Sequence, residues 1–231
     1  MFQALSNAAG FILAGGESTR MGVDKALVPL AGKPLIEHSQ AILRAAGLSA
    51  SIAGARSPLQ AFAPVIEDQA PGLGPLAGVC AALASTAAQW VAILSIDLPL
   101  IPASLIAYML HRAQIAHPAA VVPSVSGFPQ TFPAMIAREA LPALKQELEG
   151  GRTGCFAAMQ SACDRFGRPI ASLPVEMLAQ SGHVIDDKGL PPALWFLNVN
   201  TPADLARAER VLAERHRAER FRKDQPRACE I

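Results

Sequence analysis

The chain lacks strong charge, long apolar runs and a recognisable leader. Its 231 residues carry 20 Lys plus Arg and 19 Asp plus Glu, giving a net charge of +1. Nucleic-acid-binding proteins usually show a strongly basic face. No apolar run approaches the roughly 18 residues that a membrane span needs, and the N-terminal MFQALSNAAG lacks the charged region of a secretory signal. We therefore expect a cytoplasmic protein that binds neither nucleic acid nor membranes.

Paired cysteines and nucleophile arrangements are also missing. The four cysteines form no CxxC motif and have no histidine neighbours at metal-ligand spacing; they are Cys80, Cys155, Cys163 and Cys229. We interpret them as reduced thiols, with a structural zinc or disulfide set as the alternative. The five histidines are scattered, and no Ser/His/Asp or Cys/His arrangement stands out. A reaction that needs no covalent enzyme intermediate fits this composition.

What the sequence does contain is an alternation of short apolar runs with helical patterns. Helices are predicted over 34–47, 75–89 and 103–116, and strands over 10–15, 50–55, 64–68, 90–97, 119–124, 133–137 and 195–200. Buried runs such as VAILSI show no polar alternation, which is typical of parallel strands covered on both faces. The pattern predicts a three-layer α/β fold with a doubly wound, mostly parallel sheet, and an antiparallel excursion over the last two strands.

The same pattern indicates one domain over residues 1–220, with a frayed tail over 221–231. The stretch 167–192 is punctuated by Pro and Gly and is predicted to hold the longest loop. From Pro202 onward the sequence predicts a long, charged terminal helix, with Thr201 as N-cap and Pro202 at the first helical position.

The first predicted strand runs into the string LAGGESTRMGVDKAL. It contains neither GxxxxGK[ST] nor GxGxxG, so the Walker and dinucleotide-binding templates are excluded. The backbone of Gly15 and Gly16 can approach phosphate oxygens closely because no Cβ intervenes. Arg20 and Lys25 supply the cations that suit phosphates. The string predicts a polyphosphate-binding loop, against the alternative of an ordinary strand–helix connection with surface charges.

The longer string LAGGESTRMGVDKALVPLAGKPLIEH resembles the N-terminal signature of the molybdenum cofactor guanylyltransferases, which belong to the nucleotidyltransferases of Rossmann-like fold. The resemblance implies transfer of GMP from GTP to the phosphate of molybdopterin or Mo-molybdopterin. It also implies Mg²⁺ as cofactor, with Mn²⁺ as an alternative, and contacts with molybdopterin-handling proteins and target molybdoenzymes. Lys25 and Arg20 would then be catalytic, and Leu13, Ala14, Gly15 and Gly16 would bind the nucleotide.

Three further stretches extend the resemblance. VIEDQAPGLGPLAG contains a tight turn that opens a helix, and the resemblance makes Asp68 and Gly74 nucleotide-binding residues. VAILSIDLPLIP ends a buried strand in Asp97, at the edge of a parallel sheet where ligands bind. One carboxylate suffices for Mg²⁺, which keeps several waters and uses substrate phosphates. Asp97 is therefore the predicted metal ligand, nucleotide-binding residue and catalytic residue, against the alternative of a turn-capping acid.

WFLNVNTPADLARAE resembles the family segment in which an asparagine pair ends a strand. The resemblance makes Asn198 and Asn200 acceptor-binding residues, although Asn is also common at strand ends for structural reasons. Two departures touch substrate recognition: Gln130 and Thr131 stand where relatives often have His-Pro, and Ala53 or Ala55 stands where they tend to have Asn. Three alternatives therefore stay open: a cytidylyltransferase acting on the same pterin, another small-phosphate nucleotidyltransferase, and a non-catalytic nucleotide- or cofactor-binding adaptor.

Overall fold

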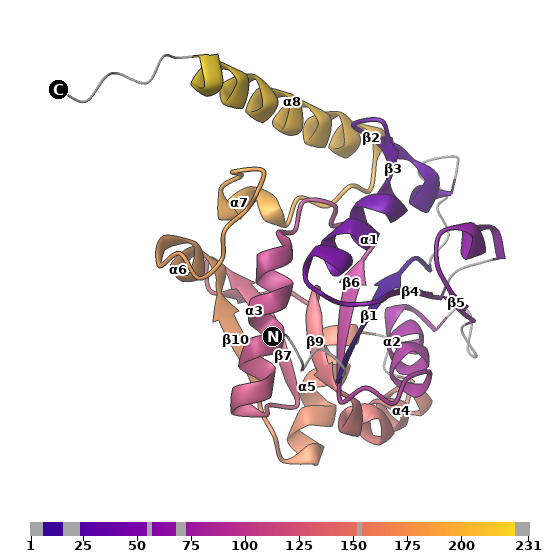
Figure 1. The fold of residues 1–231 in the computed structure, drawn as a ribbon. Helices are drawn as coiled ribbons and strands as arrows, with labels where there is room; N and C mark the ends of the chain where they lie inside the picture. Colours follow the sequence, from indigo (N-terminus) through magenta and orange to yellow (C-terminus); the bar gives the residue numbers. More distant parts are fainter. Residues whose placement is uncertain (1–6, 16–23, 55–56, 68–72, 152–153, 225–231) are drawn as a thin grey trace.

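The fold is built around one large, mostly parallel sheet (Figure 1). The computed structural model describes residues 7–15, 24–54, 57–67, 73–151 and 154–224, without the side chains of 57, 58 and 216–224. The sheet order is β10-β7-β9-β6-β1-β4-β5, with β8 paired to β7. Its strands are β1 (Ala8–Leu13), β4 (Ala50–Ala53), β5 (Val65–Ile66), β6 (Trp90–Ser95), β7 (Ala120–Val125), β8 (Phe128–Pro129), β9 (Ala134–Ala137) and β10 (Ile170–Pro174).

Helices cover both faces of this sheet. The helices of the described residues are α1 (Leu35–Ala45), α2 (Pro75–Ala84), α3 (Ala103–Ala116), α4 (Leu141–Glu149), α5 (Cys155–Phe166), α6 (Val175–Gln180), α7 (Pro192–Trp195) and α8 (Pro202–Asp224). Short 3₁₀ turns are η1 (Lys25–Leu27), η2 (Ser57–Ala61) and η3 (Arg138–Ala140), and β2 (Pro29–Leu30) pairs with β3 (Lys33–Pro34) in a separate hairpin.

The central strands are apolar on both sides because each face of the sheet has its own core. In β6, Trp90 and Leu94 pack in the cluster that contains α1 and α3, whereas Val91 and Ile93 pack in the cluster that contains α2, α4 and α5. Strand residues alternate between faces with a period of two. Two covered faces therefore require an uninterrupted apolar run, and the predicted three-layer α/β fold is confirmed.

The predicted antiparallel excursion is confirmed for β9, which pairs antiparallel with both β6 and β7. The strand predicted over 195–200 is wrong: α7 ends at Trp195, and the chain after it has no strand partner among the described residues. Pro192 suits the first turn of a helix, and the Trp195 indole N–H donates to the Leu190 carbonyl at 2.9 Å. The apolar alternation in this segment arises because Trp195 and Val199 are each buried, although no strand of the described part of the chain pairs with the segment through backbone hydrogen bonds.

The stretch 167–192 is also more regular than predicted. Gly167 ends α5 in a left-handed conformation (φ 71°), and β10 and α6 follow directly. Among the described residues, β10 pairs with β7 alone, so it is an edge strand and accommodates Pro174. Because an edge strand is only half buried, its apolar pattern was too weak to distinguish from a loop.

The carboxyl ends of β1, β4 and β6 meet at one edge of the sheet. Leu13 stands opposite Ala53 on one side and opposite Ser95 on the other, with all three strands parallel. The segments that leave these strand ends therefore begin side by side. This is the edge at which open α/β folds bind ligands.

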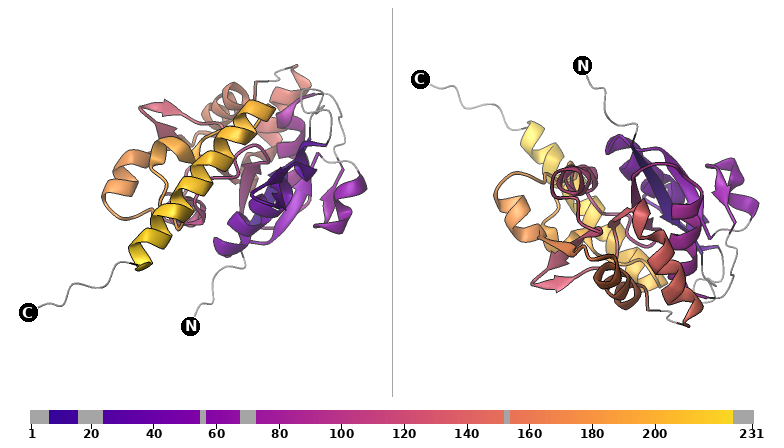
Figure 2. Two further views of the ribbon diagram at one scale, coloured as in Figure 1. Left: turned by 90° about the horizontal axis from the view of Figure 1, so that it is seen from above. Right: turned by 90° about the horizontal axis from the view of Figure 1, so that it is seen from below.

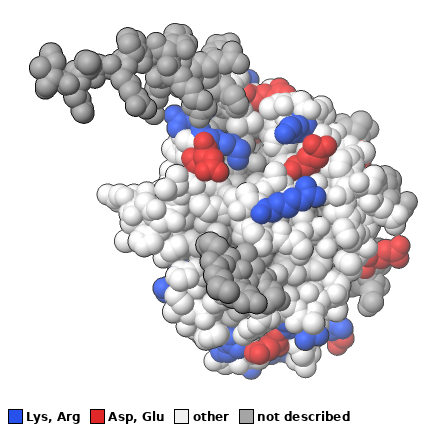
Figure 3. Space-filling view, in the orientation of Figure 1, with Lys and Arg blue, Asp and Glu red and all other residues white. Residues whose placement is uncertain are grey.

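Helix α8 lies across the top of the molecule in Figure 1 and extends past the body, as both views of Figure 2 also show. Acidic and basic side chains are interspersed on the face drawn in Figure 3, where uncharged residues dominate. Within the described part of the chain, no helix combines the length and apolarity that crossing a membrane requires.

Candidate nucleotide and metal site

Asp97 stands directly beyond the central strand β6. The backbone N–H of Ile96 donates to the Leu13 carbonyl at 3.1 Å, so the turn that carries Asp97 is fastened to the end of β1. The Asp97 side chain is 24% exposed. The structure thus presents this carboxylate at the ligand-binding edge while its backbone is fixed by the sheet.

Lys25 reaches the same place from the segment after β1. It begins η1, whose N-cap Asp24 accepts a hydrogen bond from the Ala26 N–H at 3.0 Å. The Lys25 ammonium donates to Asn200 Oδ1 at 2.6 Å and lies 3.7 Å from Asp97 Oδ2. Burial lowers the pKa of Lys25 below its usual value, and the nearby Asp97 carboxylate opposes that shift. The amine is a partly desolvated donor held next to an acid.

Asn200 comes from the segment between α7 and α8. The backbone N–H of Val199 donates to the Asp97 carbonyl at 2.9 Å, and Val199 is fully buried. Asn198 and Asn200 flank it and are both exposed, although no strand carries them. The structure brings Lys25, Asp97 and Asn200 together, and Asn198 is exposed two residues before Asn200.

The end of β1 is held close to β4. Ala14 donates its N–H to the Ala53 carbonyl at 3.2 Å, and a Cβ added to Gly15 would lie 2.7 Å from the Gly54 carbonyl oxygen. Gly54 itself has φ +73° and donates its N–H to Ile66 at 3.2 Å. A side chain at position 15 would therefore push the start of the predicted phosphate loop away from β4.

The remaining predicted residues are distributed as follows. Leu13 is buried at the end of β1, and Gly74 is the N-cap of α2 with φ +77°. Because α2 follows the carboxyl end of β5, Gly74 starts a helix on the same edge of the sheet. Gly16, Arg20 and Asp68 lie outside the described residues.

Comparisons with known proteins bear on what this edge does. A family model described as a MobA-like NTP transferase domain matches residues 10–165, which contain Lys25 and Asp97. The chain belongs to the MobA-like NTP transferase family. The match includes the strand–loop–turn segment on which the resemblance was based, and that resemblance is confirmed.

Relatives of this NTP transferase extend over most of its length. It is 32% identical over 206 residues to a probable molybdenum cofactor guanylyltransferase of Haloferax mediterranei, covering 85% of this chain and 90% of the relative. It is 38% identical over 174 residues to another of Opitutus terrae, covering 73% and 85%. Among solved structures, the molybdopterin-guanine dinucleotide biosynthesis protein A of Archaeoglobus fulgidus is 25% identical with a TM-score of 0.70, covering 89% of this chain and 99% of that one.

The side chains at this site of the NTP transferase suit a magnesium ion whose coordination shell is completed by the nucleotide substrate. No group of three or more His, Cys, Asp or Glu side chains that could hold a metal occurs among the described residues. The partly exposed Asp97 carboxylate offers oxygen ligands, and the Asn200 amide oxygen lies 2.6 Å from the Lys25 ammonium that Asp97 also approaches. Mg²⁺ prefers oxygen ligands and commonly takes one or two carboxylates together with phosphates and water. The residues present therefore fit Mg²⁺ bound with a nucleotide.

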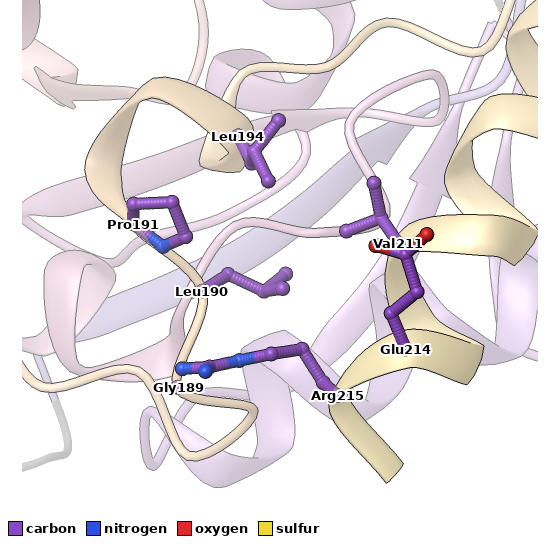
Figure 4. A pocket seen from close by; sticks show the side chains of 7 residues that line it. All are labelled: Gly189, Leu190, Pro191, Leu194, Val211, Glu214 and Arg215. Atoms are coloured by element: carbon purple, nitrogen blue, oxygen red, sulfur yellow. The ribbon is translucent and has the colours of Figure 1, made fainter. Parts of the chain in front are cut away.

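Two cavities of the NTP transferase lie apart from this cluster. One, of about 360 Å³, opens between α8 and the segment before α7 (Figure 4), with Leu190, Leu194, Val211 and Arg215 in its lining. The other, of about 400 Å³, lies over α2 and α4. Lys25, Asp97 and Asn200 line neither of them.

Three contributors to the site were missed in the sequence. Asp24 caps η1, Gly54 meets Gly15, and Asp204 binds the Asn200–Thr201 backbone. For Asp204 the signal was present: Thr201 and Asp204 have the spacing of a capping box. Asp24 and Gly54 carry no such local signal, because a lone Asp or Gly between elements is common in any loop.

Proposed function

We propose that this chain transfers the guanylyl group of GTP to the phosphate of molybdopterin, forming molybdopterin guanine dinucleotide and pyrophosphate. One observation carries the proposal: the Lys25 ammonium is held against Asp97 and Asn200 at the carboxyl edge of the sheet. A cation and a carboxylate at this edge suit a metal-bound polyphosphate. Membership of an NTP transferase family and relatives named as guanylyltransferases support the guanylyl reaction.

The proposed reaction balances without an enzyme-bound intermediate. A phosphate oxygen of the pterin forms a bond to the α-phosphorus of GTP. The bond from that phosphorus to the oxygen bridging to the β-phosphate breaks, and its electron pair leaves with pyrophosphate. A phosphate monoester with a second pKa near ~6 is already deprotonated at neutral pH, so the acceptor needs no general base.

Lys25 is the residue to which we assign charge stabilisation. Its side chain is only 16% exposed, and an amine in such a partly desolvated position interacts with developing phosphate charge more strongly than one in water. The loop that begins at Gly15 would hold the triphosphate through backbone N–H groups, with Leu13 and Ala14 near the base. Gly16, Arg20, Asp68 and Gly74 complete the nucleotide site in this proposal, on the basis of the sequence.

Asp97 would hold Mg²⁺, with Mn²⁺ as the alternative ion. The ion would neutralise charge on the nucleotide phosphates. Asp97 itself also orients the Lys25 amine, which lies 3.7 Å away. Asn198 and Asn200 are exposed on the same segment and would face the acceptor.

Pyrophosphate release tests the proposal. The purified protein is incubated with Mg²⁺, molybdopterin and one nucleotide at a time: GTP, CTP, ATP or UTP. Release that needs both GTP and the pterin is the expected result. Release with CTP alone would assign the protein to a cytidylyl reaction at the same site, and nucleotide binding without turnover would support an adaptor.

A further inference from the structure

The N-terminus of α8 is fastened to the segment that reaches Lys25. Asp204 Oδ2 accepts three hydrogen bonds: from the Asn200 N–H at 3.1 Å, the Thr201 N–H at 2.9 Å and the Thr201 hydroxyl at 2.8 Å. In return, Thr201 Oγ1 accepts the Asp204 N–H at 3.2 Å. The Thr201–Asp204 exchange is a capping box with Asp in place of the usual Glu or Gln.

One of these bonds is not explained by helix capping. A capping box satisfies donors at the N-cap and within the first turn of the helix. The Asn200 N–H lies one residue before the N-cap, so its bond to Asp204 satisfies no orphan donor of α8. What it fixes is the backbone of the residue whose side chain accepts the Lys25 ammonium at 2.6 Å.

Asn200 is also fixed from its other side. The preceding residue, Val199, is buried and donates its N–H to the Asp97 carbonyl at 2.9 Å. Asn200 therefore stands between one anchor on the Asp97 backbone and another on the Asp204 carboxylate. Its amide in turn holds the Lys25 amine beside the Asp97 side chain.

We infer that Asp204 is a positioning residue for the proposed nucleotidyl transfer: through Asn200, it holds the Lys25 ammonium next to Asp97. The inference rests on the proposed function only for its effect on turnover. Asp204→Ala should lower kcat by between about tenfold and a hundredfold, as expected for a misplaced catalytic group. The KM for GTP should change by less than about threefold, because the start of the phosphate loop is held by β4.

A measurement that needs no turnover tests the geometry. Trace acetylation with acetic anhydride, read by peptide mass spectrometry, gives the reactivity of Lys25 relative to the exposed Lys33. In Asp204→Ala and in Asn200→Ala, the Lys25 to Lys33 ratio should rise several-fold, since either change frees the amine from Asn200. The double variant should show no larger ratio than the single ones, because both changes break the same linkage.

Three further variants separate positioning from helix stability. Leu212→Ala removes a buried side chain of α8 eight residues beyond Asp204 and outside its hydrogen bonds, and it serves as the control for a general loss of helix stability, compared at an equal loss in Tm. Asp204→Glu keeps a carboxylate and introduces the usual capping-box acid. Its Lys25 reactivity and its kcat should therefore lie closer to the wild-type values than those of Asp204→Ala. Asp204→Asn retains an acceptor oxygen and should fall between Asp204→Ala and wild type.

The outcomes are distinct. A wild-type Lys25 reactivity in Asp204→Ala, an equal rise in Leu212→Ala, or multiplied effects in the double variant would each overturn the inference and leave Asp204 as a helix cap. If no variant and no wild-type preparation releases pyrophosphate from GTP, the proposed function fails. Even then, the Lys25 to Lys33 acetylation ratios decide whether Asp204 positions Lys25.

Discussion

Replacing Lys25 with Met should separate activity from stability. Burial lowers the pKa of Lys25, so the folded protein holds this ammonium at a cost that the unfolded chain avoids. A folded-state pKa below the unfolded value means that stability rises with pH as the amine loses its proton. Met removes the ammonium and with it this desolvation cost. Asp97 and Asn200 lose a partner but are open enough to be hydrated.

The expected loss of activity is large for the same structural reason. Removing one preorganised, partly desolvated donor from a reacting centre typically lowers kcat by about 10² to 10³, or ~2.7–4 kcal/mol. Lys25→Met should therefore lose about that much turnover with GTP and molybdopterin. Its Tm should equal or exceed the wild-type value.

Steady-state kinetics and thermal unfolding, followed on the same preparations, check both halves of this prediction. Lys33→Met is the matched control, because Lys33 is an exposed lysine of the neighbouring hairpin, and it should leave kcat unchanged. Near-normal kcat in Lys25→Met would refute the charge role. A Tm lower by several degrees would show instead that the Asn200 and Asp97 contacts stabilise the fold.

Asp97→Asn should lower the Mg²⁺-dependent turnover rate at least about a hundredfold and leave the far-ultraviolet circular dichroism spectrum unchanged. Retained turnover would show that Asp97 is not the metal ligand. Gly15→Ala should destabilise the fold by about 1–3 kcal/mol in urea melts, because its Cβ would meet the Gly54 carbonyl oxygen. In Gly78→Ala the obstacle is a flexible Leu13 methyl, so a smaller effect is expected. Burial raises the pKa of Cys155 to about 12 from 9.0, so the unfolded chain ionises first as pH rises. Wild type should therefore lose about 1.4 kcal/mol more than Cys155→Ala between pH 8 and 10, and equal losses would contradict that origin.

The layers of the fold could be predicted from the sequence because each depends on a local pattern. The strand around Ile93 is apolar on both faces, and the α3 stretch has a helical period, so both were predicted at nearly their observed bounds. The same use of apolar patterns predicted a strand over 195–200, and that prediction is wrong. There, Trp195 and Val199 are each buried singly, and the backbone takes one hydrogen bond from Val199 to Asp97 without a ladder.

The candidate site could be predicted as a set of residues but not as an arrangement. Lys25 and Asp97 were found because each follows a strand in a polar context, and Asn200 because of the family resemblance. The contact between Lys25 and Asn200 joins residues 175 positions apart in the chain. No periodicity in the sequence reports such a contact, since it depends on which segments lie side by side in the fold. The parallel pairing of β1 with β6 brings Lys25 near Asp97, and the hydrogen bond from the Val199 N–H to the Asp97 carbonyl brings Asn200 to both.

The expected Asn of the second strand corresponds to Ala53 or Ala55, and the structure shows what position 53 offers. Ala55 lies outside the described residues, and the Ala53 side chain is fully buried in the core shared with α2 and Leu13. Its carbonyl accepts the Ala14 N–H at 3.2 Å, so position 53 contributes backbone to the edge of the site and no side chain. An Asn at this position would place an amide in an apolar core without a partner, at a cost of about 1–3 kcal/mol. The next residue, Gly54, has a left-handed conformation that turns the chain against Gly15.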